Sequence, residues 1–141
     1  MPLVLSNNTR LLVIRTWPRL VASKDQLVGR MRQYLLETHP GRPPEEAALA
    51  ASLLFAMLVS QAAALESSTG GPDFEAIEAE LSGQGIDQSY RSRFGDALVP
   101  IMRGALEPAP SERICAAWID FYWAILRKLA ATQSASEGRA A

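Results

Sequence analysis

Apolar residues recur every three to four positions along almost the whole chain, and this spacing is what most limits its fold. No stretch of useful length alternates apolar and polar residues, and the sequence has no Asn-Gly or Asp-Gly pair to close a hairpin. The pattern therefore predicts an all-α domain of about six helices. The predicted helices cover residues 9–22, 24–39, 44–66, 73–81, 87–106 and 112–131.

The helical spacing also predicts which face of each helix is buried. The expected inward residues are Leu11, Ile14, Trp17 and Val21 in the first helix, Leu27, Met31, Tyr34 and Leu35 in the second, Leu54, Met57, Leu58, Gln61 and Leu65 in the third, and Tyr90, Phe94, Leu98, Ile101 and Met102 in the fifth.

Asn7 or Asn8 is expected to cap the first helix and Ser111 the last. Pro18 and Pro100 are expected to kink the helices that contain them.

The breaks between helices are rich in proline and glycine, as in "PGRPP", "SSTGGP" and "EPAPS". At 141 residues the chain is long enough for one domain with a sizeable core. We assign residues 1–131 to that domain and expect 132–141, "TQSASEGRAA", to form a disordered C-terminal tail.

Net charge, cysteine content and the apolar segments limit which partners and which cellular compartment the sequence predicts. The net charge of −1 gives no electrostatic footprint for nucleic acid. The single cysteine, Cys115, forms no internal disulfide and suits a reducing compartment. The N-terminus does not look like a signal peptide, and the longest apolar run, 47–60, reads as a buried helix rather than a membrane span. A cytoplasmic protein without membrane contacts is expected.

Catalytic patterns are missing from the sequence, so we do not expect an enzyme. It contains one histidine, His39, and no Ser–His–acid set, metal-ligand cluster or phosphate-binding glycine loop. The "GQG" at 83–85 is typical of a turn that ends a helix.

Three segments carry a family resemblance: "TWPRLVASKDQLVGRMRQYLLETHP", "GIDQSYRSRFGDALVPIM" and "CAAWIDFYWAI". In order and spacing they resemble segments of bacterial globins, in particular the globin domains of flavohaemoglobins and globin-coupled sensors. The resemblance spans about residues 6–130 and implies a globin-like fold.

The chain departs from this family where haem would bind. The position of the proximal histidine is taken by Leu81, and that of the distal tyrosine by Arg32. The haem-wedging phenylalanine falls near Glu46 and the distal glutamine near Ala50, while Tyr90 is retained without its histidine partner. Leucine has no lone pair for iron. Haem is therefore disfavoured as a cofactor, and no metal ligand is assigned.

Two ligand-binding alternatives stay open. One is a haem protein of atypical coordination, through His39 or Tyr90, that binds oxygen or nitric oxide. In the other, Arg32 holds a fatty-acid carboxylate or another small anion at a former haem pocket. That pocket would be lined by Arg32, Ala50, Leu54, Leu81 and Tyr90. The less specific interpretations are an outward Arg32, a surface or helix-terminal His39 and a core Tyr90.

The last helix is apolar around most of its circumference. One stripe, Ile114, Trp118, Phe121, Tyr122, Ile125 and Leu129, is expected to face the core. The second stripe, Cys115, Ile119, Trp123, Leu126 and Ala130, is expected to be covered by a second copy, with Trp123 as anchor. The alternatives are cover by the N-terminal segment or a simple surface aromatic. The globin resemblance, with its haem ligand lost, implies a haem-free sensory or protein-interaction module in bacterial stress signalling, with a possible partner protein, and the second stripe predicts that it is dimeric.

Overall fold

Six helices make up the fold of the computed structural model, which describes residues 4–66 and 73–140, with side chains to residue 133. The helices are α1 (Asn7–Ala22), α2 (Lys24–Thr38), α3 (Pro44–Ala64), α4 (Phe74–Gly83), α5 (Gln88–Ala105) and α6 (Glu112–Ala140). No strand occurs in these described ranges. The prediction of an all-α domain with about six helices is confirmed.

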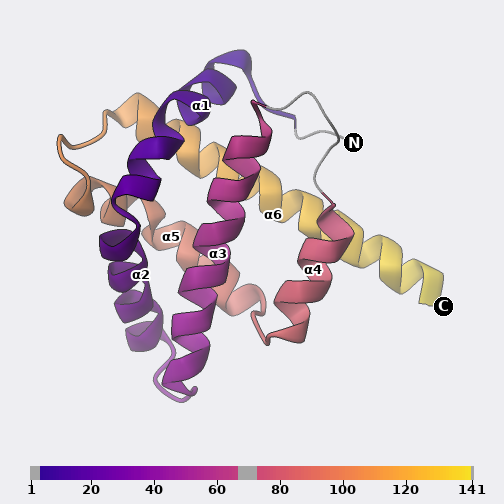
Figure 1. Ribbon diagram of the computed structural model, residues 1–141. Helices are drawn as coiled ribbons and strands as arrows, with labels where there is room; N and C mark the ends of the chain where they lie inside the picture. The colour runs from indigo at the N-terminus through magenta and orange to yellow at the C-terminus, as the bar shows by residue number, and fades with distance from the viewer. Residues whose placement is uncertain (1–3, 67–72, 141) are drawn as a thin grey trace.

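The helices form two crossed layers (Figure 1). In the front layer α3 is flanked by α2, and behind them α5 and α6 cross the molecule. α2 packs on both α3 and α5, whereas α6 packs on α1, α4 and α5. The core lies between the layers, and its largest fully buried side chains include Trp118, Tyr122, Phe94 and Phe121. The fold therefore leaves α3 with one side turned away from the other helices.

Side-chain caps set the starts of four helices. Ser6 Oγ accepts from the Thr9 amide at 3.1 Å, so the cap of α1 lies one residue before the predicted Asn7. Ser111 caps α6 as predicted, accepting from Ile114 N at 3.2 Å. Asp73 and Asp87 cap α4 and α5 in the same way. Each cap satisfies an amide that the first turn leaves without a partner.

The buried face of α1 differs from the predicted one. Leu11 and Val21 are 49% and 43% exposed. The buried residues are Thr9, Val13, Thr16 and Leu20. Thr16 Oγ1 donates to the Leu12 carbonyl at 2.6 Å and accepts from Trp118 Nε1 at 2.7 Å. A threonine whose hydroxyl both donates and accepts a hydrogen bond can be buried at this interface as an aliphatic residue can. Hydrophobic periodicity counts threonine as polar and so does not predict its burial.

Two further expectations concern helix continuity. Pro18 and Pro100 lie on exposed sides of α1 and α5, and both helices continue past them. α6 continues to Ala140, through most of the segment 132–141 that was expected to be disordered. That segment contains no proline and is rich in alanine, so its composition allows a helix to continue.

Candidate functional site

The structure separates Arg32 from the other residues predicted to bind a ligand. Ala50, Leu54 and Tyr90 are fully buried, and Leu81 is 3% exposed. Arg32, by contrast, is exposed on α2. The predicted anion site on Arg32 is therefore wrong: a guanidinium on the outer surface cannot hold a carboxylate among these buried residues.

Bulky side chains leave little space between α1, α2, α3 and α5. The void there has a volume of about 10 Å³. It is lined by Leu20, Leu27, Met31, Phe55, Phe94, Leu98, Ile101 and Met102. This volume is at the lower limit for one water molecule. The void accommodates neither a porphyrin nor a fatty-acid chain, and Leu81 offers no axial ligand. The residues present do not fit haem.

His39 is a buried part of the structure, at the C-terminal end of α2. Its ring stacks on Tyr90 with centroids 4.2 Å apart, and the residue is only 8% exposed. Nδ1 lies 2.9 Å from the Leu35 carbonyl, and Nε2 lies 2.8 Å from Ser89 Oγ. Because a carbonyl only accepts, Nδ1 carries the proton and donates it. The helix-terminal position was predicted correctly, but the burial was not, and both nitrogens are engaged within the protein.

Tyr90 is the least satisfied polar residue of the core. Its hydroxyl is buried and has no hydrogen-bond partner among the described residues. Burial raises the pKa of Tyr90, although the Arg42 guanidinium, 4.3 Å from the ring centroid, opposes the shift. Burial thus favours the neutral phenol.

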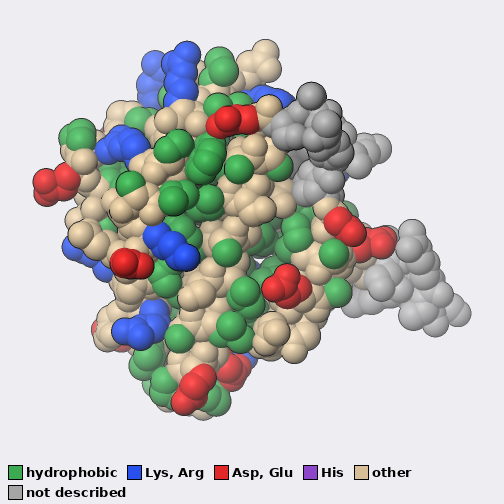
Figure 2. Space-filling model, in the orientation of Figure 1, with side chains coloured by type: hydrophobic (Ala, Val, Ile, Leu, Met, Phe, Trp, Pro, Cys, Tyr) green, Lys and Arg blue, Asp and Glu red, His purple; other side chains and the backbone are tan. Residues whose placement is uncertain are grey.

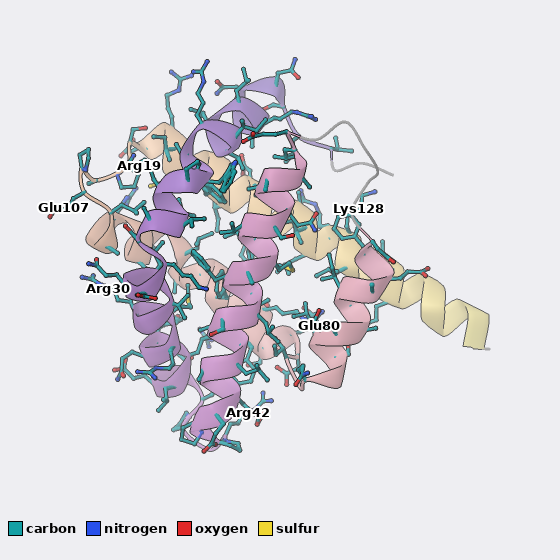
Figure 3. All side chains as sticks on the ribbon, viewed as in Figure 1. Arg19, Arg30, Arg42, Glu80, Glu107 and Lys128 are labelled. Atoms are coloured by element: carbon teal, nitrogen blue, oxygen red, sulfur yellow. The ribbon has the colours of Figure 1, made fainter. Side chains whose placement is uncertain are left out.

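A polar pocket of about 440 Å³ opens beside the N-terminus of α5. Its lining includes Arg42, at the turn between α2 and α3 (Figure 3), and Arg91. Arg42 is 2.8 Å from both Glu46 and Asp87, and Arg91 is 2.7 Å from Glu78. Three carboxylates thus neutralise two guanidinium groups, which disfavours an anion site. The sequence analysis missed the pairs of Arg42 with Asp87 and of Arg91 with Glu78, whose members are 45 and 13 positions apart.

The second stripe of α6 is covered largely from within the chain. Cys115 is 2% exposed, and Ile119, Trp123 and Leu126 are partly buried and pack against the core. Trp123 lies over Gly95 of α5, where an added Cβ would be 2.7 Å from the indole ring. A second copy is therefore not needed to cover most of this stripe, because α1, α4 and α5 pack against α6.

The helix with a long uncharged exposed side is α3. Its sequence has no charged residue from 47 to 65. Ser52, Ala56 and Ser60 are exposed, and Leu49, Leu53, Val59 and Ala63 beside them are half-buried. Figure 2 shows this side of the molecule, where hydrophobic and other uncharged side chains occupy the strip over α3. We refer to these seven residues as the α3 face.

α3 is also the one helix in the described residues that is long and apolar enough to cross a membrane. Half of the apolar window is buried inside the fold, and core helices of soluble proteins pass the same test. Nine of its residues are buried between α1, α2 and α5. Burial in the core therefore explains the apolar residues on the inner side of α3. It does not explain why the α3 face carries no charged residue.

The comparisons with known proteins do not add an identity. No family model matches the chain, and searches of curated proteins and of solved structures find no match. The helices confirm the all-α class, and the globin resemblance stays a prediction. Within the described residues, no group of three or more His, Cys, Asp or Glu side chains could hold a metal ion.

Proposed function

We propose that this protein is a non-catalytic, haem-free protein-interaction module that binds a helix of a partner protein on its α3 face. The observation that carries the proposal is the uncharged, solvent-facing side of α3 from residue 49 to residue 63. A helix that is apolar on all sides is usually buried on all sides. Here the fold covers one side and leaves an uncharged surface of exposed small residues and half-buried aliphatic residues, which is suited to an interaction.

The spacing of the α3 face suits a helical partner. Its residues lie at positions 49, 52, 53, 56, 59, 60 and 63, with steps of one or three. These steps follow a heptad-like seam along one side of a helix. Leu49, Leu53 and Val59 supply apolar area, whereas Ser52, Ala56 and Ser60 are small and allow a close approach. The two serine hydroxyls can bond to carbonyls of their own helix when water is removed.

The filled interior favours a macromolecular partner over a small ligand. With a void of about 10 Å³ and both nitrogens of His39 engaged, the core offers little to a gas, haem or lipid. The resemblance to sensor globins favours a role in bacterial signalling. In that role the domain relays contact between proteins instead of reading a bound gas.

Photo-cross-linking tests the proposal. A benzophenone side chain replaces Ala56 on the α3 face, and in a control protein it replaces Arg32, which is exposed on α2. In cells that make the protein, the variant at position 56 should give a discrete protein adduct and the control should not. Equal adducts at both positions, or none at position 56, would contradict the proposal.

Haem titration is the second test. Addition of haem to the purified protein should produce no sharp, stoichiometric Soret band, because the void between α1, α2, α3 and α5 is too small for it and Leu81 offers no axial ligand. A stoichiometric band would show that the core opens, and would restore haem binding of atypical coordination as the function.

A further inference from the structure

The α3 face is arranged symmetrically about one residue, Ala56. Measured from this alanine, the other six positions form three pairs at equal distances along the helix. The pairs are 53 with 59, 52 with 60, and 49 with 63. We propose that the helix bound on the α3 face is α3 of a second copy, antiparallel to the first, with a two-fold axis at Ala56. This inference rests on the proposed function and names its partner.

The side chains of the pairs complement each other in this arrangement. Leu53 lies across from the second copy's Val59, so two apolar residues meet on each side of the axis. Leu49 lies across from the second copy's Ala63, where a large residue meets a small one. Ala56 lies against its own counterpart, which allows the two backbones to approach at the centre. An isologous contact requires such self-complementarity, because the same surface serves both partners.

The charges at the two ends of α3 also complement each other. Glu45 is exposed in the first turn of α3. At the other end, Arg10 of α1 donates from Nη2 to the Leu65 carbonyl at 2.8 Å, so its guanidinium lies beside the last turn. The antiparallel arrangement brings Arg10 of each copy toward the second copy's Glu45. Glu66, at the same end of α3, keeps its negative charge and accepts from Trp17 Nε1 at 2.6 Å, so Arg10 would lie among Glu66 of its own chain and Glu45 of the second copy.

This charge pattern favours an antiparallel arrangement over a parallel one. A parallel pair would place Glu45 beside the second copy's Glu45 and Arg10 beside Arg10, which is repulsive at both ends. It would also align the two helix dipoles in the same direction. The α3 face therefore determines the orientation of the second copy as well as its location.

Cysteine cross-linking tests both the partner and its orientation, in a background where the buried Cys115 is replaced by serine. Ala56→Cys should give a disulfide-linked dimer under mild oxidation, because small residues at the crossing allow the Cα approach that a disulfide needs. Ser52→Cys and Ser60→Cys should each stay monomeric alone and link to each other when mixed. A self-linked Ser52→Cys or Ser60→Cys dimer would indicate a parallel pair and overturn the arrangement.

Sedimentation equilibrium, up to about 1 mM protein, provides the second measurement. The wild type should show twice the chain mass of 15.3 kDa, and Ala56→Glu should weaken association by at least about tenfold. Because Ala56 is exposed, the variant should keep its helical circular dichroism. Arg10→Glu and Glu45→Arg should each weaken association, and the double variant should restore it.

The failures of the two proposals are distinguishable. If the wild type is a monomer and the cross-linker at position 56 captures a different protein, dimerisation through α3 is refuted. The proposed interaction module is then retained with another partner. A monomer that floats with phosphatidylcholine vesicles would overturn both. A dimer that survives Ala56→Glu would place the interface elsewhere and overturn this inference.

Discussion

The buried pair of Arg91 and Glu78 joins α5 to α4 and gives the most decisive test of the fold. Arg91 is 2% exposed, and its Nη1 lies 2.7 Å from Glu78 Oε2. Its Nε donates to the Ile86 carbonyl at 2.9 Å, and Glu78 Oε1 accepts from Ser82 Oγ at 3.0 Å. The Glu78 carboxylate therefore compensates the buried charge of the Arg91 guanidinium, which would be strongly unfavourable without it.

Removal of one partner should cost far more than removal of both. Glu78→Ala leaves the Arg91 guanidinium buried without a carboxylate, and this loss typically costs about 3–5 kcal/mol. We expect about 3 kcal/mol, at the low end, because Nε keeps its bond to Ile86 and the adjoining pocket gives access to water. A loss of this size is a large part of a total stability of about 5–15 kcal/mol. Glu78→Leu combined with Arg91→Met should lie within about 1 kcal/mol of wild type.

Urea unfolding followed by far-ultraviolet circular dichroism measures these differences. Glu78→Gln is the matched control, because it keeps the shape and one acceptor and should lose about 1–2 kcal/mol. A loss below about 1 kcal/mol for Glu78→Ala would match an exposed surface pair and refute the reasoning. A double variant as unstable as Glu78→Ala would refute it as well, since no buried charge would remain to explain the loss.

Paired variants test three further features of the packing. Gly95→Ala should destabilise the fold by about 1–3 kcal/mol in urea unfolding, because its Cβ would lie 2.7 Å from Trp123, whereas Gly29→Ala, with no atom within 4 Å, should stabilise it by about 0.5–1 kcal/mol. Tyr90→Phe removes a buried hydroxyl without a partner and should raise the unfolding free energy by about 1 kcal/mol, whereas Tyr122→Phe loses a 2.7 Å bond to a main-chain carbonyl of α5 and should lower it by about as much. Burial raises the pKa of Tyr122, so the native state keeps a proton that the unfolded chain releases above pH ~10. Stability should therefore fall above that pH by up to about 1.4 kcal/mol per unit, and urea midpoints of Tyr122→Phe should fall less steeply. Equal effects within either pair, or equal alkaline slopes for Tyr122→Phe and wild type, would contradict these assignments.

Helical periodicity was sufficient to predict the class and most buried faces. In α2, Leu27, Met31 and Leu35 are buried as expected, and in α5 so are Phe94 and Leu98. In these helices the apolar residues form one stripe, so the period determines a single inward side. Periodicity fails for α1, where the buried Thr16 hydroxyl bonds to the Leu12 carbonyl four residues before it and to the Trp118 indole 102 positions away.

The candidate site was harder to predict because helix composition does not reveal which neighbours surround a helix. α3 and α6 both appear apolar on all sides, and the sequence interpretation placed the free surface on α6. In the fold, α6 lies against three helices, and Trp123 finds room over Gly95, a position that reads in sequence as an ordinary helical glycine. The same uncertainty applied to His39, whose burial depends on Tyr90 and Ser89, about fifty positions away.

The two apolar helices nevertheless differ in a way that physical chemistry explains. α6 carries large aromatic residues, whose area must be buried within the chain for a domain of this size to be stable. The α3 face carries no aromatic residue; its side chains are aliphatic or small, and their exposure costs a monomer little. Such a face can remain in water before a partner binds and still exclude water when another helix approaches closely. The placement of aromatic residues inside and small uncharged residues outside is what we expect of a fold that is stable alone and associates through α3.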